Sequence, residues 1–122
     1  MTPNEAITAA FNMLPVKMSG QKARVILLAI QLQEDPELLR VQKGCGAARG
    51  IFQFEKGGGC KGVLNHPATK REAERVCELR QVIPTPADVW PNLESDDVLA
   101  AVFARLLLWT DPAKLPAIGE VR

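Results

Sequence analysis

Two long apolar runs dominate the pattern of hydrophobic and polar positions. Residues 23–30 are almost entirely apolar, apart from one arginine. Such a run is too apolar for a surface helix, so a helix over residues 23–33, capped by Ser19, is predicted to be the most buried element. Residues 96–109 begin with acids and are then apolar nearly all round, which predicts a second long helix packed beside the first.

Capping signals predict shorter helices before and after the central run. Thr2 and Glu5 have the spacing of a capping box, and Pro15 ends the helix that they begin. Thr69 and Glu72 repeat the same spacing, and apolar residues follow them at helical intervals. The chain therefore predicts helices near its start and after residue 69.

Glycine and proline mark the segments between these helices. Residues 41–62 hold seven of the nine glycines in no repeating pattern. They indicate an ordered loop with short extended pieces at residues 51–54, whose apolar side chains need burial. The prolines within residues 84–91 indicate a linker-like bend, in which residues 85–88 could start one short turn. The fold class predicted is mostly α: one small helical domain over residues 1–122, with a glycine-rich cleft loop and at most short strands.

Composition narrows the function classes only modestly. The 122 residues suit one domain, and 47% hydrophobic with 24% charged residues is ordinary for a globular protein. No membrane span and no secretory signal are visible, so we expect synthesis in the cytoplasm, with periplasmic action requiring a holin or a virion. Residues 17–80 hold 12 Lys or Arg against 7 Asp or Glu. This excess favours an acidic polymer, unless it forms ordinary solvated faces.

The sequence predicts no metal site and no cofactor. Cys45, Cys60 and Cys77 are widely spaced, and together with His66 they could supply four zinc ligands. Structural zinc sites usually bring their ligands in close pairs, so Cys60 and Cys77 are interpreted as small buried residues. A single histidine argues against a Ser-His-Asp triad, and no Gly-Lys-Ser/Thr of a P-loop occurs.

A candidate general acid closes the central helix. Counting back from Glu34 in helical steps meets Ile30, Leu27 and Ala23, all apolar. A carboxyl group on that face is expected to lose hydration, which favours its protonated form. Cleavage of a glycosidic bond needs such a carboxylic acid. The alternative is a polar residue at a fraying helix end, with Asp35-Pro36 stopping the helix.

A glycine-rich segment that follows Glu34 supports the first interpretation. It contains Gly-Ile-Phe-Gln at residues 50–53 and Gln-Phe-Glu-Lys-Gly-Gly-Gly at residues 53–59. Residues 20–66 thereby resemble the lysozyme-like superfamily, and within it lytic transglycosylase domains of phages and prophages. In that family the catalytic Glu ends a core helix, and a Gly-Leu-Met-Gln-like segment lines the cleft floor. Asp35 departs from the family's usual Ser, and the family's downstream Tyr segment has no counterpart, because the chain contains no Tyr.

The resemblance implies cleavage of peptidoglycan glycan strands, by a muramidase or a lytic transglycosylase, with Glu34 as the general acid. Glu55 is the candidate second carboxylate for hydrolysis; the alternative is a loop acid paired with Lys56 or Arg49. A transglycosylase of this family can use one Glu alone.

The remaining site residues are predicted to bind substrate. Gln53 would hydrogen-bond a sugar amide or hydroxyl, or bond the backbone of the loop. Arg49 would bind a peptide-stem carboxylate or order the loop through carbonyl groups. Gly50, Gly57 and Gly58 would let the backbone approach the glycan, or merely turn the chain. Peptidoglycan and other phage proteins are the expected partners. Nucleic acid is not, because the aromatic residues do not interleave with basic ones. The competing function is a non-catalytic phage structural or cell-wall-binding protein with a lysozyme-like shell.

Overall fold

Helices make up most of the described chain, which a computed structural model covers at residues 1–44 and 46–111. Within these residues strand pairing is limited to isolated bridges of Arg49 with Val41 and with Phe54. The prediction of a mostly α domain is confirmed. In chain order the elements are α1 (Pro3–Met13), the 3₁₀ turn η1 (Val16–Met18), α2 (Gln21–Glu34), the π turn η2 (Lys56–Cys60), α3 (Lys61–Asn65), α4 (Lys70–Leu79), α5 (Pro86–Ser95) and α6 (Asp97–Trp109).

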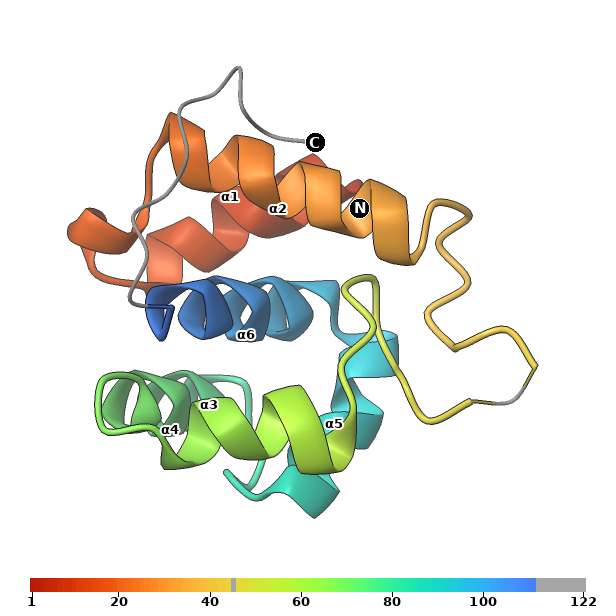
Figure 1. The fold of residues 1–122 in the computed structure, drawn as a ribbon. Helices are drawn as coiled ribbons and strands as arrows, with labels where there is room; N and C mark the ends of the chain where they lie inside the picture. The colour runs from red at the N-terminus through yellow and green to blue at the C-terminus, as the bar shows by residue number, and fades with distance from the viewer. Residues whose placement is uncertain (45, 112–122) are drawn as a thin grey trace.

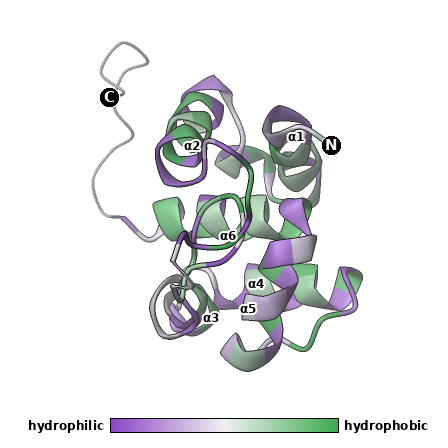
Figure 2. Cartoon of the chain, turned by 90° about the vertical axis from the view of Figure 1, so that its right-hand side faces the viewer, coloured by the Kyte–Doolittle hydropathy of each residue, from purple (hydrophilic) through white to green (hydrophobic). Residues whose placement is uncertain are grey.

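Helix α6 lies at the centre of the fold (Figure 1). Helices α1 and α2 cover one side of it, α3 and α4 cover the other, and α5 lies beside its N-terminal end. Figure 2 looks along α6 and shows its apolar residues enclosed by the other helices. Every residue from Val98 to Leu106 is buried. Removing this apolar surface from water is the main driving force for the fold.

The prediction that residues 23–33 form the most buried helix is wrong. Helix α2 buries only Ala23, Ile26, Leu27 and Gln31, whereas Leu32 is 62% exposed. Helix α2 contains an apolar run but begins and ends with polar residues, whereas α6 is apolar along most of its length. Only α6 has helices on both sides, so α2 lies in an outer layer with one face in water.

Capping at the start of α1 follows the sequence prediction. Thr2 Oγ1 accepts a hydrogen bond from the Glu5 amide at 3.1 Å, and Glu5 Oε1 accepts one from the Thr2 amide at 2.7 Å. This reciprocal pair is the predicted capping box. The Thr2 amide, followed by the Thr2 side chain, lowers the pKa of Glu5.

Two other predicted caps are absent, because the hydroxyls bond elsewhere. Ser19 Oγ donates to the Val16 carbonyl at 2.7 Å, and the N-cap of α2 is Gly20. Thr69 is fully buried and its Oγ1 donates to the Val63 carbonyl at 2.7 Å, joining α3 to α4. In both cases the hydroxyl group donates to a backbone carbonyl that precedes the helix and does not accept a hydrogen bond from an amide of the first turn.

Residues 84–91 form no linker-like bend, because helix α5 occupies most of this stretch. Thr85 caps α5 by accepting from the Asp88 amide, and Pro91 lies inside the helix. A proline removes one helical hydrogen bond. Val89 and Leu93 are buried in the core shared with α6, and this packing stabilises the helix despite the proline.

Candidate functional site

The C-terminal end of α2 carries the predicted general acid into solvent. Along the line of residues identified from the sequence, Leu27 is fully buried, Ile30 is half-buried and Glu34 is exposed. The expected loss of hydration at Glu34 is therefore not found. Burial falls along this line because the last turn of α2 extends past the core.

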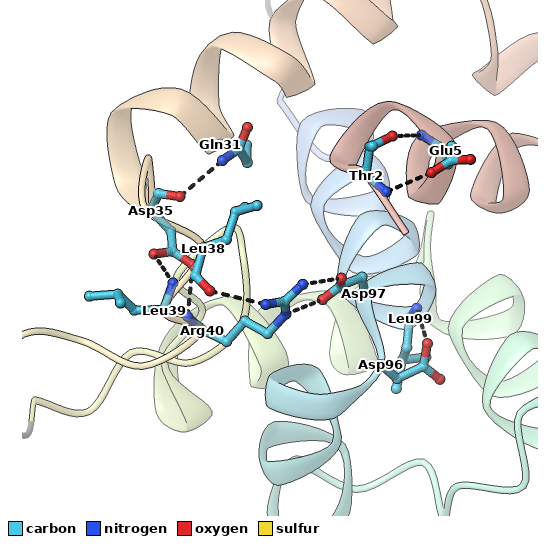
Figure 3. A network of polar contacts seen from close by, with 10 residues as sticks. All are labelled: Thr2, Glu5, Gln31, Asp35, Leu38, Leu39, Arg40, Asp96, Asp97 and Leu99. Carbon is cyan, nitrogen blue, oxygen red and sulfur yellow. Dashed lines mark hydrogen bonds and ion pairs between the residues drawn. The ribbon is translucent and has the colours of Figure 1, made fainter.

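The neighbouring Asp35 is the buried carboxylate, at 4% exposure. Its two oxygens accept hydrogen bonds from the amides of Leu39 and Arg40, both at 2.9 Å. Gln31, also buried, donates its side-chain amide to the Asp35 carbonyl at 2.9 Å (Figure 3). Both carboxylate oxygens thus accept hydrogen bonds from backbone amides, and Asp35 stabilises the turn after α2.

Arg40 fastens this turn to the start of α6. Its Nε and one terminal nitrogen donate to the two oxygens of Asp97 at 2.8 and 2.7 Å (Figure 3). A third donor bonds the Leu38 carbonyl at 3.0 Å. The hydrogen bonds that Arg40 donates to Asp97 raise the pKa of Arg40, so the pair stays charged. The position of Glu34 is fixed at its C-terminal side by this network.

A tight turn at residues 50–53 forms the other side of the site. Arg49 and Phe54 exchange backbone hydrogen bonds at 2.8 and 2.9 Å, and Gln53 Nε2 donates to the Gly50 carbonyl at 3.0 Å. Gly50 has φ +83°, and an added Cβ would lie 2.7 Å from the Leu93 carbonyl oxygen. Only glycine fits here, because both the backbone angle and the contact with α5 exclude a side chain. The turn buries Phe52 while Gln53 stays half-exposed.

Glu34 and Gln53 line two pockets at once. The first, about 290 Å³, has a mostly apolar wall from α2, α6 and the loop, and also includes Glu55. The second, about 280 Å³, is lined mainly by the turn after α2. The apolar residues of the first pocket are Ile30, Phe52, Phe54, Ala104, Leu107 and Leu108. An elongated ligand that filled both pockets would pass over Glu34 and Gln53.

Of the predicted site residues, Glu34, Gln53 and Glu55 come together at the first pocket, and Arg49 does not. Arg49 donates to the carbonyls of Gly46 and Ala48 at 2.6 and 2.9 Å. Its guanidinium carbon lies 4.8 Å from the Trp90 ring centre. Arg49 therefore orders the loop through carbonyl groups, the alternative considered from the sequence.

The predicted glycines are not part of the pocket wall either. Gly50 is buried against α5, and Gly57 and Gly58 are exposed outside both described linings. Gly59 does line the first pocket, and an added Cβ there would lie 2.8 Å from the Phe54 ring. The glycine-rich sequence indicated a site in this region, but it did not show that Gly59, and not Gly57 or Gly58, lines the pocket.

The described residues contain no group of three potential metal ligands from His, Cys, Asp and Glu. Cys60 and Cys77 are free thiols and fully buried, as the sequence predicted, whereas Cys45 lies outside the described residues. Burial raises the pKa of Cys60 to about 12 and that of Cys77 to about 11, with Glu74 adding to the second shift.

Comparisons with protein-family models, curated proteins and solved structures find no match to this chain. Among the described helices, none combines the length and apolar character needed to cross a membrane.

Proposed function

We propose that this chain cleaves the glycan strands of peptidoglycan, with Glu34 as the general acid. The observation that carries the proposal is the place of Glu34 and Gln53 between two pockets. An enzyme that cuts a polysaccharide holds sugar units on both sides of the bond and needs its acid at that junction. Glu34 occupies such a junction, and Gln53 beside it offers an amide donor and acceptor for sugar hydroxyl or amide groups.

Substrate would supply the desolvation that the free protein lacks at Glu34. A sugar ring seated on the apolar wall formed by Ile30, Phe52 and Leu107 would displace water from the neighbouring carboxyl group. Removing water favours the protonated acid, which then transfers its proton to the leaving glycosidic oxygen. Exposure in the free protein is therefore compatible with this role.

Glu55 is the proposed second carboxylate for hydrolysis. It lines the first pocket together with Glu34, and it is exposed, with no ion pair to another described residue. As a base it would activate a water molecule; as a nucleophile it would attack the sugar carbon. In the transglycosylase variant of the proposal, Glu34 acts first as acid and then as base, and a hydroxyl of the substrate closes an anhydro ring. An enzyme of this kind would reach the cell wall through a holin or as part of a virion.

One observation favours the alternative of a non-catalytic phage structural or cell-wall-binding protein. Both carboxylates of the proposed pair are exposed, and the buried carboxylate, Asp35, has both oxygens committed to backbone amides. A protein that binds glycan without cutting it would use the same two pockets.

Substitution of Glu34 separates these two functions. Glu34→Gln keeps the size and removes the transferable proton, so release of fragments from purified peptidoglycan should fall by a factor on the order of 10² or more. Binding to the insoluble wall should persist. Glu78→Gln is the matched control, because Glu78 is also an exposed acid in the last turn of a helix, α4. It should leave activity unchanged.

Product analysis then distinguishes the mechanisms. New reducing ends indicate hydrolysis, and their rate should also fall in Glu55→Gln. Anhydro ends indicate transglycosylation, which Glu55→Gln should leave largely intact. Wild-type protein that binds peptidoglycan but releases no fragments between about pH 4 and pH 8 would reject the enzyme and favour the binding protein.

A further inference from the structure

A third pocket lies at the opposite end of α2, about the first turn of that helix. It has a volume of about 520 Å³ and is lined by Lys17 before α2, by residues 19–23 and by the last part of α6. From α6 and its end come Arg105, Leu108, Trp109 and Asp111. Nothing in the proposed glycan cleavage uses this pocket.

Arg105 is the first feature that points to a ligand. Its residue is only 3% exposed and lines the pocket, and its Nε donates to the Met18 carbonyl. No carboxylate of the described residues pairs with its guanidinium group. Burial lowers the pKa of Arg105, as expected for a cation that no carboxylate of the described residues meets. A buried cation is costly unless an anion meets it, and a bound anion would remove that cost.

Two lysines add positive charge to the same pocket. Lys17 Nζ lies 5.7 Å from the centre of the Trp109 ring, and the Arg105 guanidinium carbon lies 5.4 Å from it. The indole thus holds both cations by cation–π contacts. Lys22 joins them from the first turn of α2. Against these three cations, Asp111 is the single acid that the described lining contains.

The backbone at the start of α2 supplies further donors. Gly20 is the N-cap of α2 and has φ +130°. Because glycine has no side chain, it accepts no hydrogen bond from the first-turn amides through one. The amides of Gln21, Lys22 and Ala23 have no hydrogen-bond acceptor among the described residues. Unpaired amides and the positive end of the helix dipole favour an anion at this place.

We propose that this pocket binds an oxyanion, the phosphate or carboxylate group of a larger ligand. Arg105 and the first-turn amides of α2 hold the oxygens, and Lys17 and Lys22 compensate the charge. The volume far exceeds that of a bare oxyanion, so the rest of the ligand extends along Leu108 and Trp109. Leu108 also lines the pocket beside Glu34, so the two pockets share one wall residue.

Titration of isotope-labelled protein with inorganic phosphate, and separately with acetate, followed by nuclear magnetic resonance, tests the site. At constant ionic strength, amide resonances of residues 21–23 and the indole resonance of Trp109 should shift with saturation in at least one titration. Saturation by phosphate alone assigns a phosphate ligand, and saturation by acetate alone assigns a carboxylate ligand. Chloride at the same ionic strength should produce no saturable shift. No saturation with either anion up to tens of millimolar would overturn the proposal.

Variants locate the binding energy. Arg105→Lys keeps the charge and loses the planar fork, so affinity should fall about tenfold. The double variant Lys17→Gln, Lys22→Gln touches only exposed side chains and should fold normally even if Arg105→Lys does not. It should weaken binding about fivefold or more, through loss of nearby positive charge. Lys70→Gln, an exposed lysine at the start of α4, is the control and should bind like the wild type. Unchanged affinity in the double variant would contradict the proposed site. None of these readouts depends on glycan cleavage.

Discussion

The N-terminal ends of helices α2 and α6 carry charges of opposite sign. At the start of α6, Asp96 accepts the Leu99 amide at 3.0 Å, and Asp97 adds a second acid in the first turn. The start of α2 has no acid and no side-chain cap, and it carries Lys22. The end of α2 has no basic residue and carries the acid Glu34. Relative to the helix dipole, α6 has stabilising acids at its start and no basic residue in its last turn, whereas α2 has a charge of the unfavourable sign at both ends.

This difference shows where the chain gives up stability. A charge of the wrong sign near a helix end costs about 0.3–1 kcal/mol, and α2 bears it twice. Each reversed end faces a pocket, the oxyanion pocket at Lys22 and the paired glycan pockets at Glu34. Functional sites are the places where local rules for stability are expected to fail. Helix α6 holds the fold together, and α2 carries the proposed chemistry.

Shortening one side chain in each of the two helices should show the largest contrast in the free energy of unfolding. Phe103 in α6 is fully buried, so Phe103→Ala should lower the free energy of unfolding by about 3–5 kcal/mol through lost burial and a cavity. Leu32 in α2 is 62% exposed, so Leu32→Ala should change it by less than about 0.5 kcal/mol. Urea denaturation of both variants provides the measurement. Similar losses in the two would show that α2 and α6 share the core equally.

Alkaline pH should test the closure of the core around α6. Cys60 and Cys77 pack in that core, and burial raises the pKa of each thiol to about 12 and about 11, above the ordinary value of 9.0. The contribution of these two uncharged thiols to the free energy of unfolding is complete below pH 9. It is lost as pH rises toward 11–12, because the thiols ionise at lower pH in the unfolded chain than in the folded one. Each thiol should lower the free energy of unfolding by at most about 1.4 kcal/mol per pH unit in this range.

The variant Cys60→Ala isolates one share of that loss. Between pH 9 and pH 11 its stability should fall less steeply than that of the wild type, whatever the substitution costs at neutral pH. Guanidinium denaturation across this range measures the slope. Equal slopes would mean that the Cys60 thiol is not protected from water as its burial indicates.

Reversing the charges on α2 should give the smallest effect and the most direct test of the trade-off. Lys22→Glu and Glu34→Lys each place the favourable sign at a helix end. Each should raise the free energy of unfolding by about 0.3–1 kcal/mol at low salt. Lys22→Glu should also abolish oxyanion binding, and Glu34→Lys should abolish glycan cleavage.

High salt supplies the control for these reversals. Near 1 M salt the Debye length is about 3 Å, so the gain in stability should largely disappear while the functional losses remain. A loss of stability in both variants would contradict the view that the ends of α2 are strained for function.

Several elements could be predicted because their causes are local. The Thr2–Glu5 capping box lies within four residues, and it forms as expected. Burial of Ile51, Phe52 and Phe54 was predicted and is found, but residues 51–53 form a turn and not the predicted extended piece. The prolines around α5 misled the prediction, because the packing of Val89 and Leu93 outweighs one missing hydrogen bond. From the sequence, Arg49 could either bind a substrate carboxylate or bond carbonyl groups of its own loop. Its contacts with the Gly46 and Ala48 carbonyls and with the Trp90 ring, which only the structure shows, favour the second.

By itself, the amino-acid sequence determined that this chain is a small helical domain, that Glu34 ends a long helix and that a glycine-rich loop follows it. Periodicity, caps and glycine content are properties of neighbouring residues, so they can be identified along the chain. The tertiary structure decided that α6 is central, that Asp35 is buried while Glu34 is exposed, and that Arg105 lines the same pocket as the first turn of α2. These outcomes depend on residues distant in sequence competing for one core and one set of partners, and that competition is resolved only when the helices pack.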